Sequence, residues 1–447
     1  MKILILLLCR LLIRIVYFLN KFINVRKLQQ FLEYLDACEE LLEDMNSKSG
    51  SRRDSAIGEY TFRPFEVKRI KHKKSSAGST PYARSGHRIV CNDSAVFCFG
   101  GFNPVNDEDE SSCLFQELWK FNMITKEWTL LMGASDDLPH ELASNAMAMH
   151  GDNLIIFGGT GYPFGLQCSN RLYVYQSRKK SKEVTEVEVR GDLPPAQYGQ
   201  AILYHDGHLY TIGGTEGFDY TCDVFRLNIV TRTWECAYAC KPNVREDPPG
   251  RYRHEIAFDG ERIFIIGGGT SDSVFSLATI PTYDLKENVW SYTETKRDPS
   301  LPPPGVPAAR KCHSCVQYHT DNGIEIIVAG GYAGRSHFGD IWKLNLSTFE
   351  WRLMQKSSLP YPLFFHDAAS SSAGCMYIFG GIKFSRNARV TQMRTNVVFK
   401  TWMTIPKLSE ICWEAMLHYY PGLPEVKRES LLELGIPIKF VQRVHDI

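Results

Sequence analysis

The chain has 447 residues, which suits about three average domains or one long repeat array. Its hydrophobic fraction of 44% and charged fraction of 23% are ordinary for a soluble globular protein, and they exclude a disordered chain or one with many membrane spans. Lys and Arg total 51 against 50 Asp and Glu, so the chain lacks the basic excess typical of nucleic-acid-binding proteins.

The N-terminal segment contains an apolar run over residues 3–19 that Arg10 and Arg14 interrupt. Each Arg near the centre of a membrane span costs about 2.5–3.5 kcal/mol, and both share one helical face with Lys21. A membrane span, an interfacial helix and an extension without function therefore remain as interpretations. We assign residues 1–55 to an N-terminal extension and expect its first 26 residues to be dispensable.

A motif then recurs six times, in which an apolar run ends in two glycines. In five of these units a tryptophan follows the glycine pair at a similar interval, and a short aromatic strand precedes that tryptophan. The first glycines are Gly100, Gly158, Gly213, Gly267, Gly330 and Gly380. The tryptophans are Trp128, Trp234, Trp290, Trp351 and Trp402.

The residue pattern of each unit predicts four short antiparallel strands. The second strand carries the glycine pair and the fourth carries the tryptophan. One such sheet cannot bury both faces alone, whereas a closed ring of sheets can. The order of glycine pair, aromatic strand and tryptophan resembles the kelch repeat over about residues 80–402. The resemblance implies an all-β fold, a six-bladed kelch β-propeller over residues 56–404. We expect Tyr60–Val67 to supply the outer strand that closes the ring.

Motifs of known enzyme chemistry are missing from the sequence, which has no Gly-x-Ser-x-Gly elbow, His-Glu-x-x-His or P-loop. The 13 cysteines are scattered through strand-like runs, as expected for reduced thiols in the cytoplasm or nucleus. Cys312 and Cys315 lie in an apparent strand and would point to opposite faces. We predict a non-catalytic protein with no cofactor and no metal; a copper enzyme on a kelch fold is the most distant alternative.

The sequence becomes helical after Trp402, and residues 405–447 form the third predicted region. Helices are expected from Leu408 to Tyr419, from Glu425 to Leu434, and from Pro437 towards His445. One apolar face of the first helix carries Leu408, Ile411, Cys412, Ala415 and Met416.

The spacing of Leu408, Cys412 and Met416 resembles the elongin-binding box of ubiquitin-ligase receptors, in which a large Leu fills a pocket and a small residue allows close approach. Four further residues match the pattern of the adjacent cullin-2 box, namely Ile436, Pro437, Phe440 and Val444. A helical cap packed on the propeller edge is the alternative interpretation of the tail.

A kelch propeller followed by both boxes resembles the kelch-repeat substrate receptors of cullin-2 ubiquitin ligases. The resemblance implies elongin C, elongin B and cullin-2 as partners, and a propeller that binds C-terminal peptides ending in Gly or Ala, including alanine-tailed products of stalled translation. The competing interpretation is a kelch scaffold that regulates a signalling enzyme such as a serine/threonine phosphatase.

A bound carboxylate needs cationic or backbone donors. Arg84, Arg251 and Arg310 precede glycine-pair strands at equivalent positions, where they either join blades or contact a ligand. Arg335 follows the fifth glycine pair, close to Tyr332. The family resemblance implies that Arg335 contacts the carboxylate, and we list Arg310, Arg251, Arg84 and Tyr332 as further candidates.

Overall fold

The computed structural model describes residues 60–72, 80–104, 113–135, 137–179, 183–241, 244–385 and 392–445. The apolar run over residues 3–19 and the rest of the predicted extension lie outside these residues. The chain divides into two units, of which one comprises Phe62–Glu414 with the last two residues, and the other the chain up to Thr61 with Ala415–His445. Within the described ranges, no helix is long and apolar enough to cross a membrane.

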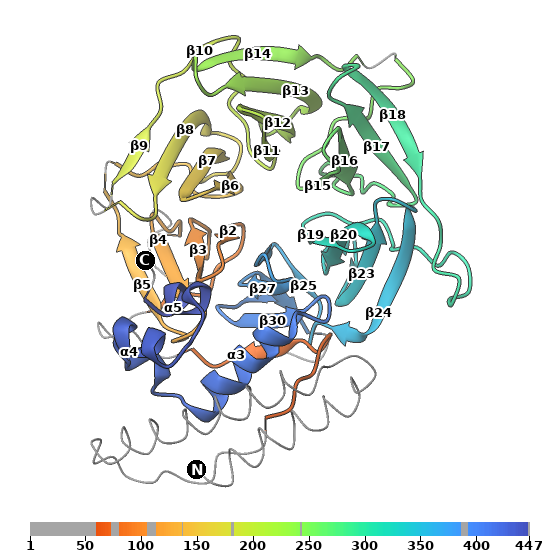
Figure 1. The fold of residues 1–447 in the computed structure, drawn as a ribbon. Coiled ribbons are helices and arrows are strands. Elements are labelled where there is room, and N and C mark those ends of the chain that lie inside the picture. Colours follow the sequence, from red (N-terminus) through yellow and green to blue (C-terminus); the bar gives the residue numbers. More distant parts are fainter. Residues whose placement is uncertain are drawn as a thin grey trace. The chain divides into compact units, whose positions relative to one another are not determined.

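Six blades form the larger unit in the described part of the chain, each built on an antiparallel sheet of four strands (Figure 1). Blade 1 contains β2 (Arg88–Cys91), β3 (Ala95–Phe99), β4 (Leu118–Asn122) and β5 (Trp128–Met132). Blade 2 contains β6 (Ala146–His150), β7 (Asn153–Thr160), β8 (Cys168–Gln176) and β9 (Val184–Glu186). Blade 3 contains β11 (Ala201–His205), β12 (His208–Thr215), β13 (Tyr220–Asn228) and β14 (Thr233–Tyr238), with β10 (Arg190–Gly191) parallel to β14.

The remaining blades repeat this order. Blade 4 contains β15 (Glu255–Phe258), β16 (Arg262–Ile266), β17 (Thr279–Asp284) and β18 (Val289–Glu294). Blade 5 contains β19 (Ser314–Thr320), β20 (Gly323–Ala329), β23 (Asp340–Asn345) and β24 (Glu350–Ser358). Blade 6 contains β26 (Asp367–Ser370), β27 (Cys375–Phe379), β30 (Val398–Trp402) and β1 (Lys68–Ile70). Short strands decorate blades 5 and 6: β21 (Tyr332–Ala333), β22 (Ser336–His337), β25 (Leu363–Phe364), β28 (Ile382–Phe384) and β29 (Gln392–Arg394). The predicted six-bladed propeller is therefore confirmed.

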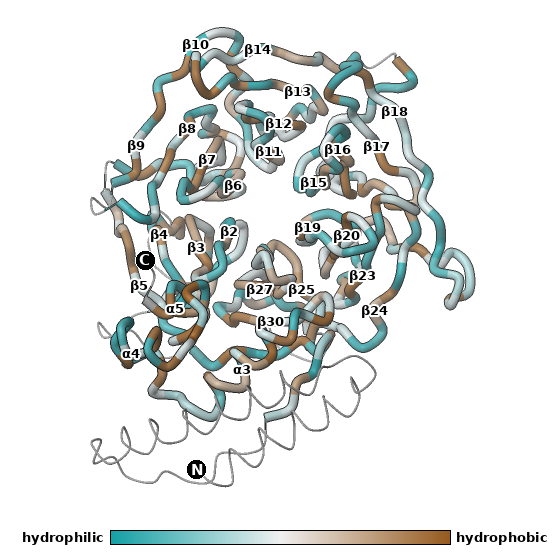
Figure 2. Tube along the Cα trace, in the orientation of Figure 1, coloured by the Kyte–Doolittle hydropathy of each residue, from teal (hydrophilic) through white to brown (hydrophobic). Residues whose placement is uncertain are grey.

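The apolar core lies between neighbouring blades, and Figure 2 shows apolar segments along the strands that form it. Each outer-strand tryptophan reaches the preceding blade: the Trp234 ring lies 5.4 Å from that of Phe157, and the Trp128 ring 4.9 Å from that of Phe379. Blade 2 lacks this tryptophan, and the buried Val184 takes its place. Each sheet therefore depends on its neighbours to bury its faces, as expected for a propeller.

The ring is closed by β1, which pairs antiparallel with β30. We expected this strand within Tyr60–Val67, which is a few residues too early. Pro64 has no N–H to donate, and Phe65 has a left-handed φ of 66°, so the chain turns there before the strand begins. The Phe65 N–H donates to the carbonyl of Trp402 at 3.0 Å.

Trp402 does not lie on an outer strand, as its spacing had suggested. Val398 of β30 pairs with Phe379 as Leu118 of β4 pairs with Phe99, so Trp402 occupies the position that Asn122 holds in blade 1. In four other blades the third strand ends in a residue whose side chain accepts N–H groups of the following turn: Asn122, Asn228, Asp284 and Asn345. Blade 6 has no such turn because its fourth strand comes from the N-terminal side.

Ring closure by β1 predicts that Phe62→Ser with Ile70→Ser lowers the free energy of unfolding. Both side chains are partly buried against the core between blades 1 and 6, and each substitution loses part of the about 1.5–3 kcal/mol that full burial contributes. Thermal denaturation measures the loss, with the exposed Arg69→Ser as the matched control. A chain that starts at Lys27 keeps β1 and should melt like the full chain. A double variant as stable as the wild type would contradict this closure.

The tail contains α3 (Leu408–Tyr419), the 3-10 turn η2 (Leu423–Glu425), α4 (Arg428–Glu433) and α5 (Ile438–His445). The first predicted helix has the expected bounds, while the second is shorter because η2 replaces its beginning. Glu414 of α3 forms an ion pair with Lys400 and accepts a hydrogen bond from the Trp402 indole at 3.2 Å. The first turns of α3 are thereby held to β30.

Candidate binding site at the mouth of the propeller

A closed circuit of backbone hydrogen bonds surrounds the propeller axis at the end where the glycine pairs lie, which we call the mouth. Just before each innermost strand, one residue donates its N–H to the carbonyl of the equivalent residue in a neighbouring blade, at 2.8–3.2 Å. All six have left-handed φ values of 51–70°. These ring residues are Gly86, Ser144, Gly199, Arg253, Cys312 and Phe365. Cys312 therefore lies in the ring and not in a strand, since β19 begins at Ser314.

The next residue in each blade packs between blades. These six buried residues are His87, Asn145, Gln200, His254, His313 and His366. A Cβ added to Gly213 of blade 3 would lie 2.6 Å from the His254 ring, and one added to Gly330 would lie 2.8 Å from His366. In five of the six pairs the first glycine thus makes room for a side chain of the following blade, while Gly100 makes room for the backbone of Leu142. This geometry gives the four histidines a scaffolding role.

Arg84, Arg251 and Arg310 share one buried arrangement. In each, Nε donates a hydrogen bond to the backbone carbonyl two residues earlier at 3.0–3.2 Å. Nη1 donates to the backbone carbonyl of the first glycine of the pair in the same blade at 2.9–3.1 Å. Each guanidinium also lies 4.1–4.3 Å from the centre of a phenylalanine ring, that of Phe115, Phe275 or Phe338. Because these donors are used within the blades, the geometry favours the scaffolding role for all three.

Burial keeps the four interblade histidines neutral. It lowers the pKa of His254 and His366 to about 3, and it lowers the pKa of His87 and His313 well below its usual range. The unfolded chain binds protons at these positions below about pH 6.5. The stability that they contribute is therefore complete above pH 6.5 and is lost as the pH falls from 6.5 towards 3.

Acid should consequently destabilise the propeller well before ordinary carboxylates titrate. Each histidine that stays neutral in the folded chain lowers the free energy of unfolding by about 1.4 kcal/mol per pH unit below 6.5. Proton uptake by the buried carboxyls of Glu255 and Asp367 offsets part of this loss. The free energy of unfolding at pH 7.5, 6.5 and 5.5 checks the slope. His313→Gln introduces the residue that blade 3 carries at the equivalent position, Gln200. This variant should reduce the dependence of the free energy of unfolding on pH by the contribution of about one proton. An unchanged dependence would show that His313 does not contribute.

Arg253 is the ring residue with a cationic side chain. It is 5% exposed, its Nη2 donates to the Ser144 hydroxyl, and its guanidinium lies 4.9 Å from the centre of the Phe365 ring. Its Nε has no hydrogen-bond partner, and burial lowers its pKa. Among the described residues, no carboxylate forms an ion pair with it.

Two more cations lie beside the ring. Lys311, next to Cys312, is 4% exposed; its ammonium group donates to backbone carbonyls and lies 5.5 Å from the Tyr332 ring centre. Arg394 donates from Nε to the Ser85 hydroxyl at 2.9 Å, beside ring residue Gly86. Burial lowers the pKa of both cations, and neither has an ion-pair partner in the part of the chain that the structure describes. The mouth therefore gathers three partly desolvated positive charges.

Sequence reasoning missed these three residues, although a signal for two of them was present. Aligned on the scaffold arginine and the interblade histidine, Arg251-Tyr252-Arg253-His254 and Arg310-Lys311-Cys312-His313 each carry one extra cation between those positions. A cation outside the repeated positions is the signal that distinguishes these two candidates from the scaffold arginines. Arg394 lies in a different loop and had no comparable signal.

The predicted residues Tyr332 and Arg335 belong to the hairpin of β21 and β22. Two backbone hydrogen bonds of 3.1 Å join Tyr332 to Lys311, so this candidate does lie at the mouth. Arg335 is exposed in the turn of the hairpin. The structure thus places Tyr332 beside Lys311 and leaves Arg335 at a hairpin tip in solvent.

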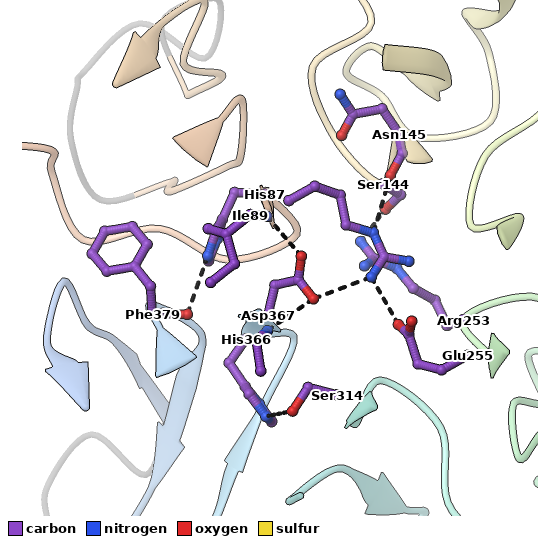
Figure 3. Close-up of polar contacts among 12 residues, drawn as sticks. His87, Ile89, Ser144, Asn145, Arg253, Glu255, Ser314, His366, Asp367 and Phe379 are labelled. Carbon is purple, nitrogen blue, oxygen red and sulfur yellow. Dashed lines mark hydrogen bonds and ion pairs between the residues drawn. The ribbon is translucent and has the colours of Figure 1, made fainter. Parts of the chain in front are cut away.

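A cavity of about 250 Å³ lies between the innermost strands on the other side of the ring. Arg88 lines it together with Glu255 and Asp367, two residues that Figure 3 labels. Nη1 of Arg88 lies 2.7 Å from a Glu255 oxygen and 3.3 Å from an Asp367 oxygen. Burial raises the pKa of both carboxyls. Burial alone would lower the pKa of Arg88, but the two carboxylates outweigh it and raise that pKa. This group is paired internally and joins blades 1, 4 and 6.

The two predicted tail motifs differ in accessibility. In the elongin-binding motif, Leu408 is 42% exposed, Ile411, Cys412 and Met416 are half-buried, and Ala415 is buried. The cullin-2 motif exposes Pro437, whereas its other members are buried: Ile436, Phe440 and Val444. The neighbouring Ile438, which the motif does not include, is 47% exposed. In the described residues, no group of His, Cys, Asp and Glu could hold a metal ion.

Comparison with known proteins agrees with this architecture. A family model for the KLHDC2/KLHL20/DRC7 kelch-repeats domain matches residues 63–268 and 238–418. A Kelch domain-containing protein 10 homolog of Drosophila melanogaster is 46% identical over 416 residues, which cover 89% of this chain and 68% of that protein. Kelch domain-containing protein 10 of Homo sapiens is 41% identical over 383 residues, 84% of this chain and 83% of that protein. Kelch domain-containing protein 3 of Bos taurus is 25% identical over 301 residues, 62% and 72% of the two chains. The chain therefore belongs to the kelch-repeat family and is a homologue of Kelch domain-containing protein 10.

Proposed function

We propose that this chain is the substrate-recognition subunit of a cullin-2–elongin B/C ubiquitin ligase. The mouth of its propeller binds C-terminal peptides ending in Gly or Ala, including alanine-tailed products of stalled translation. Its tail helices bind elongin C and cullin-2, so that the bound protein is ubiquitinated and degraded. The observation that carries this proposal is the group of three partly desolvated cations at the mouth, none of which forms an ion pair with a carboxylate among the described residues.

A free C-terminal carboxylate suits this mouth chemically. Removing Arg253, Lys311 and Arg394 from water is unfavourable unless negative charge compensates them. A carboxylate supplies that charge and accepts several hydrogen bonds, each of which contributes about 1.5–3 kcal/mol when a charged group takes part. We place Tyr332 beside Lys311 in this site, and we keep the exposed Arg335 as a contact to the peptide. Arg84, Arg251 and Arg310 remain with the scaffold.

A small last residue suits the close packing of the ring. A Cβ added to Gly86 would lie 3.1 Å from Nη2 of Arg253, and one added to Gly199 would lie 3.0 Å from the Tyr252 ring. A large side chain at the end of the peptide would have to displace these groups, which typically costs about 1–3 kcal/mol. Gly and Ala avoid that cost.

The tail supports the second half of the proposal. α3 exposes Leu408 and half-exposes Ile411 and Cys412, while Glu414 holds the helix to β30. An exposed leucine one turn before a small residue is what a partner helix needs for close packing. The first turns of the helix are therefore held to β30 and still offer Leu408, Ile411 and Cys412 to a partner.

The exposed end of α5 gives a separate prediction for cullin-2. Pro437→Ala with Ile438→Ser should weaken cullin-2 association about tenfold or more, because one exposed aliphatic side chain contributes about 1.5–3 kcal/mol when a partner buries it. Elongin association should be retained. Leu432→Ser, 40% exposed on α4, is the matched control. Titration of the elongin-bound chain with cullin-2 checks this, and equal loss of both partners would show that the second box is misassigned.

Affinity purification of the intact chain from cells tests the proposed function as a whole. We expect elongin B, elongin C and cullin-2 to co-purify, and a chain that ends at Pro406 to lose all three. Recovery of a protein phosphatase without elongins would favour the scaffold interpretation, and bound copper would favour an enzyme.

A further inference from the structure

Apolar side chains gather on the mouth over blades 1 to 3. In the loop after the second glycine pair, Tyr162 is 38% exposed, Phe164 45% and Leu166 70%. In the next loop Phe218 is 86% exposed. We call these four residues, with Phe102 at their base, the aromatic ridge. The Phe102 ring stacks on Tyr162 at 5.5 Å and meets the edge of Phe164 at 4.9 Å.

Buried threonines hold both loops of the ridge in place. Thr160 and Thr215 follow their glycine pairs directly, and each hydroxyl accepts the N–H of a glycine in its own loop at 3.0 Å, Gly165 and Gly217 respectively. The two glycines touch: a Cβ on Gly165 would lie 2.9 Å from the Cα of Gly217. Exposed rings on loops held in this way lose little conformational entropy when a ligand covers them.

The ridge begins where the proposed carboxylate site ends. The guanidinium of Arg394 lies 5.0 Å from the centre of the Phe102 ring, while its Nε is bonded to Ser85 beside the ring of the mouth. An extended peptide advances about 3.3 Å per residue. A chain whose carboxylate is held near Arg394 therefore reaches the ridge within a few residues of its end.

We propose that the aromatic ridge is a specificity subsite for an apolar side chain a few residues before the substrate's C-terminus. This inference rests on the proposed binding of C-terminal peptides. The ligand is then a peptide with a small last residue and an apolar or aromatic side chain upstream. Folded proteins mostly bury such side chains, so the subsite selects unfolded or unassembled C-terminal segments.

Titration with a set of peptides tests the subsite. The parent is a Gly/Ser-rich peptide of about ten residues that ends in Ala with a free carboxylate, and single Leu or Phe residues are placed at each upstream position. We expect about tenfold or more tighter binding at one or two of these positions. Phe164→Ser with Phe218→Ser should remove this gain and leave the affinity for the parent unchanged.

Two further variants make the outcome decisive. Val230→Ser is the matched control, since Val230 is 88% exposed in the turn after β13, at the other end of the sheet that carries Phe218. Gly217→Ala keeps both aromatic side chains but separates the loops, because its φ is +118° and its Cβ would lie 3.0 Å from Gly165; it should also reduce the gain. Absence of any positional gain, or a gain that survives the Phe164/Phe218 variant, would overturn the proposal. Equal binding of the parent as acid and as amide would instead refute the carboxylate site.

Discussion

The double variant Leu408→Ala with Cys412→Phe is expected to lose elongin C association while its propeller melts at the wild-type temperature. The first change removes the exposed leucine that a partner pocket would bury, worth about 1.5–3 kcal/mol. The second places a large ring where the helices approach closely, at a further cost of about 1–3 kcal/mol. Together these predict a loss of at least about 100-fold in a binding titration.

Leu432→Ala is the matched control for this experiment. It removes a similarly exposed leucine, 40% accessible on α4, from outside the predicted elongin-binding box. Retained elongin binding by a folded Leu408/Cys412 variant would refute the ligase interpretation of the tail. Equal loss in the control would mean that the tail binds elongin through a different face.

Arg253→Ser is expected to reduce affinity for a peptide ending in Ala by about 100-fold or more. The guanidinium supplies hydrogen bonds to the carboxylate, and its loss leaves a buried negative charge uncompensated, at about 3–5 kcal/mol. Serine is a conservative choice at this position because Ser144 holds the equivalent place in the ring at φ 60°, against 53° for Arg253. The backbone circuit should therefore survive.

Two companions separate the roles of the cations. Lys311→Met should weaken binding in the same direction, while Arg335→Ser should have the smaller effect of an exposed contact. If Arg253→Ser binds the peptide with full affinity and still prefers the free acid, the carboxylate binds elsewhere at the mouth. A large loss in Arg335→Ser alone would place it at the hairpin of β21 and β22.

The propeller could be predicted from the sequence because its glycine pairs have a steric cause that repeats. Each first glycine faces atoms of another blade, a side chain as where Gly213 faces His254 or the backbone as where Gly100 faces Leu142, so a Cβ is excluded in every unit. The closing strand and Trp402 were misplaced because blade 6 joins two distant parts of the chain. Asn396 stands six residues before Trp402 just as Asn122 stands six before Trp128, so this spacing gave no sign that Trp402 lies on a third strand.

The candidate site was less predictable, since burial and pairing decide which arginine is available. Arg310 lies three residues before its interblade histidine and Arg253 lies one residue before its own, so their aligned positions differ by only two. Arg310 nevertheless donates to Gly330 and Asp340, whereas Nε of Arg253 has no hydrogen-bond partner. The tail shows the same limit. The cullin-2 pattern fits both Pro437, which is exposed, and Phe440, which is buried, and helical periodicity cannot tell them apart.

The most direct test of the central proposal is a calorimetric titration of the intact chain with one peptide in two forms. Both forms end in Ala and carry an apolar residue upstream; one has a free C-terminal carboxylate and the other an amide. The carboxylate site predicts saturable binding of the acid and at least about 100-fold weaker binding of the amide, because the amide cannot compensate the three cations at the mouth. Equal affinity for the two forms would contradict the account.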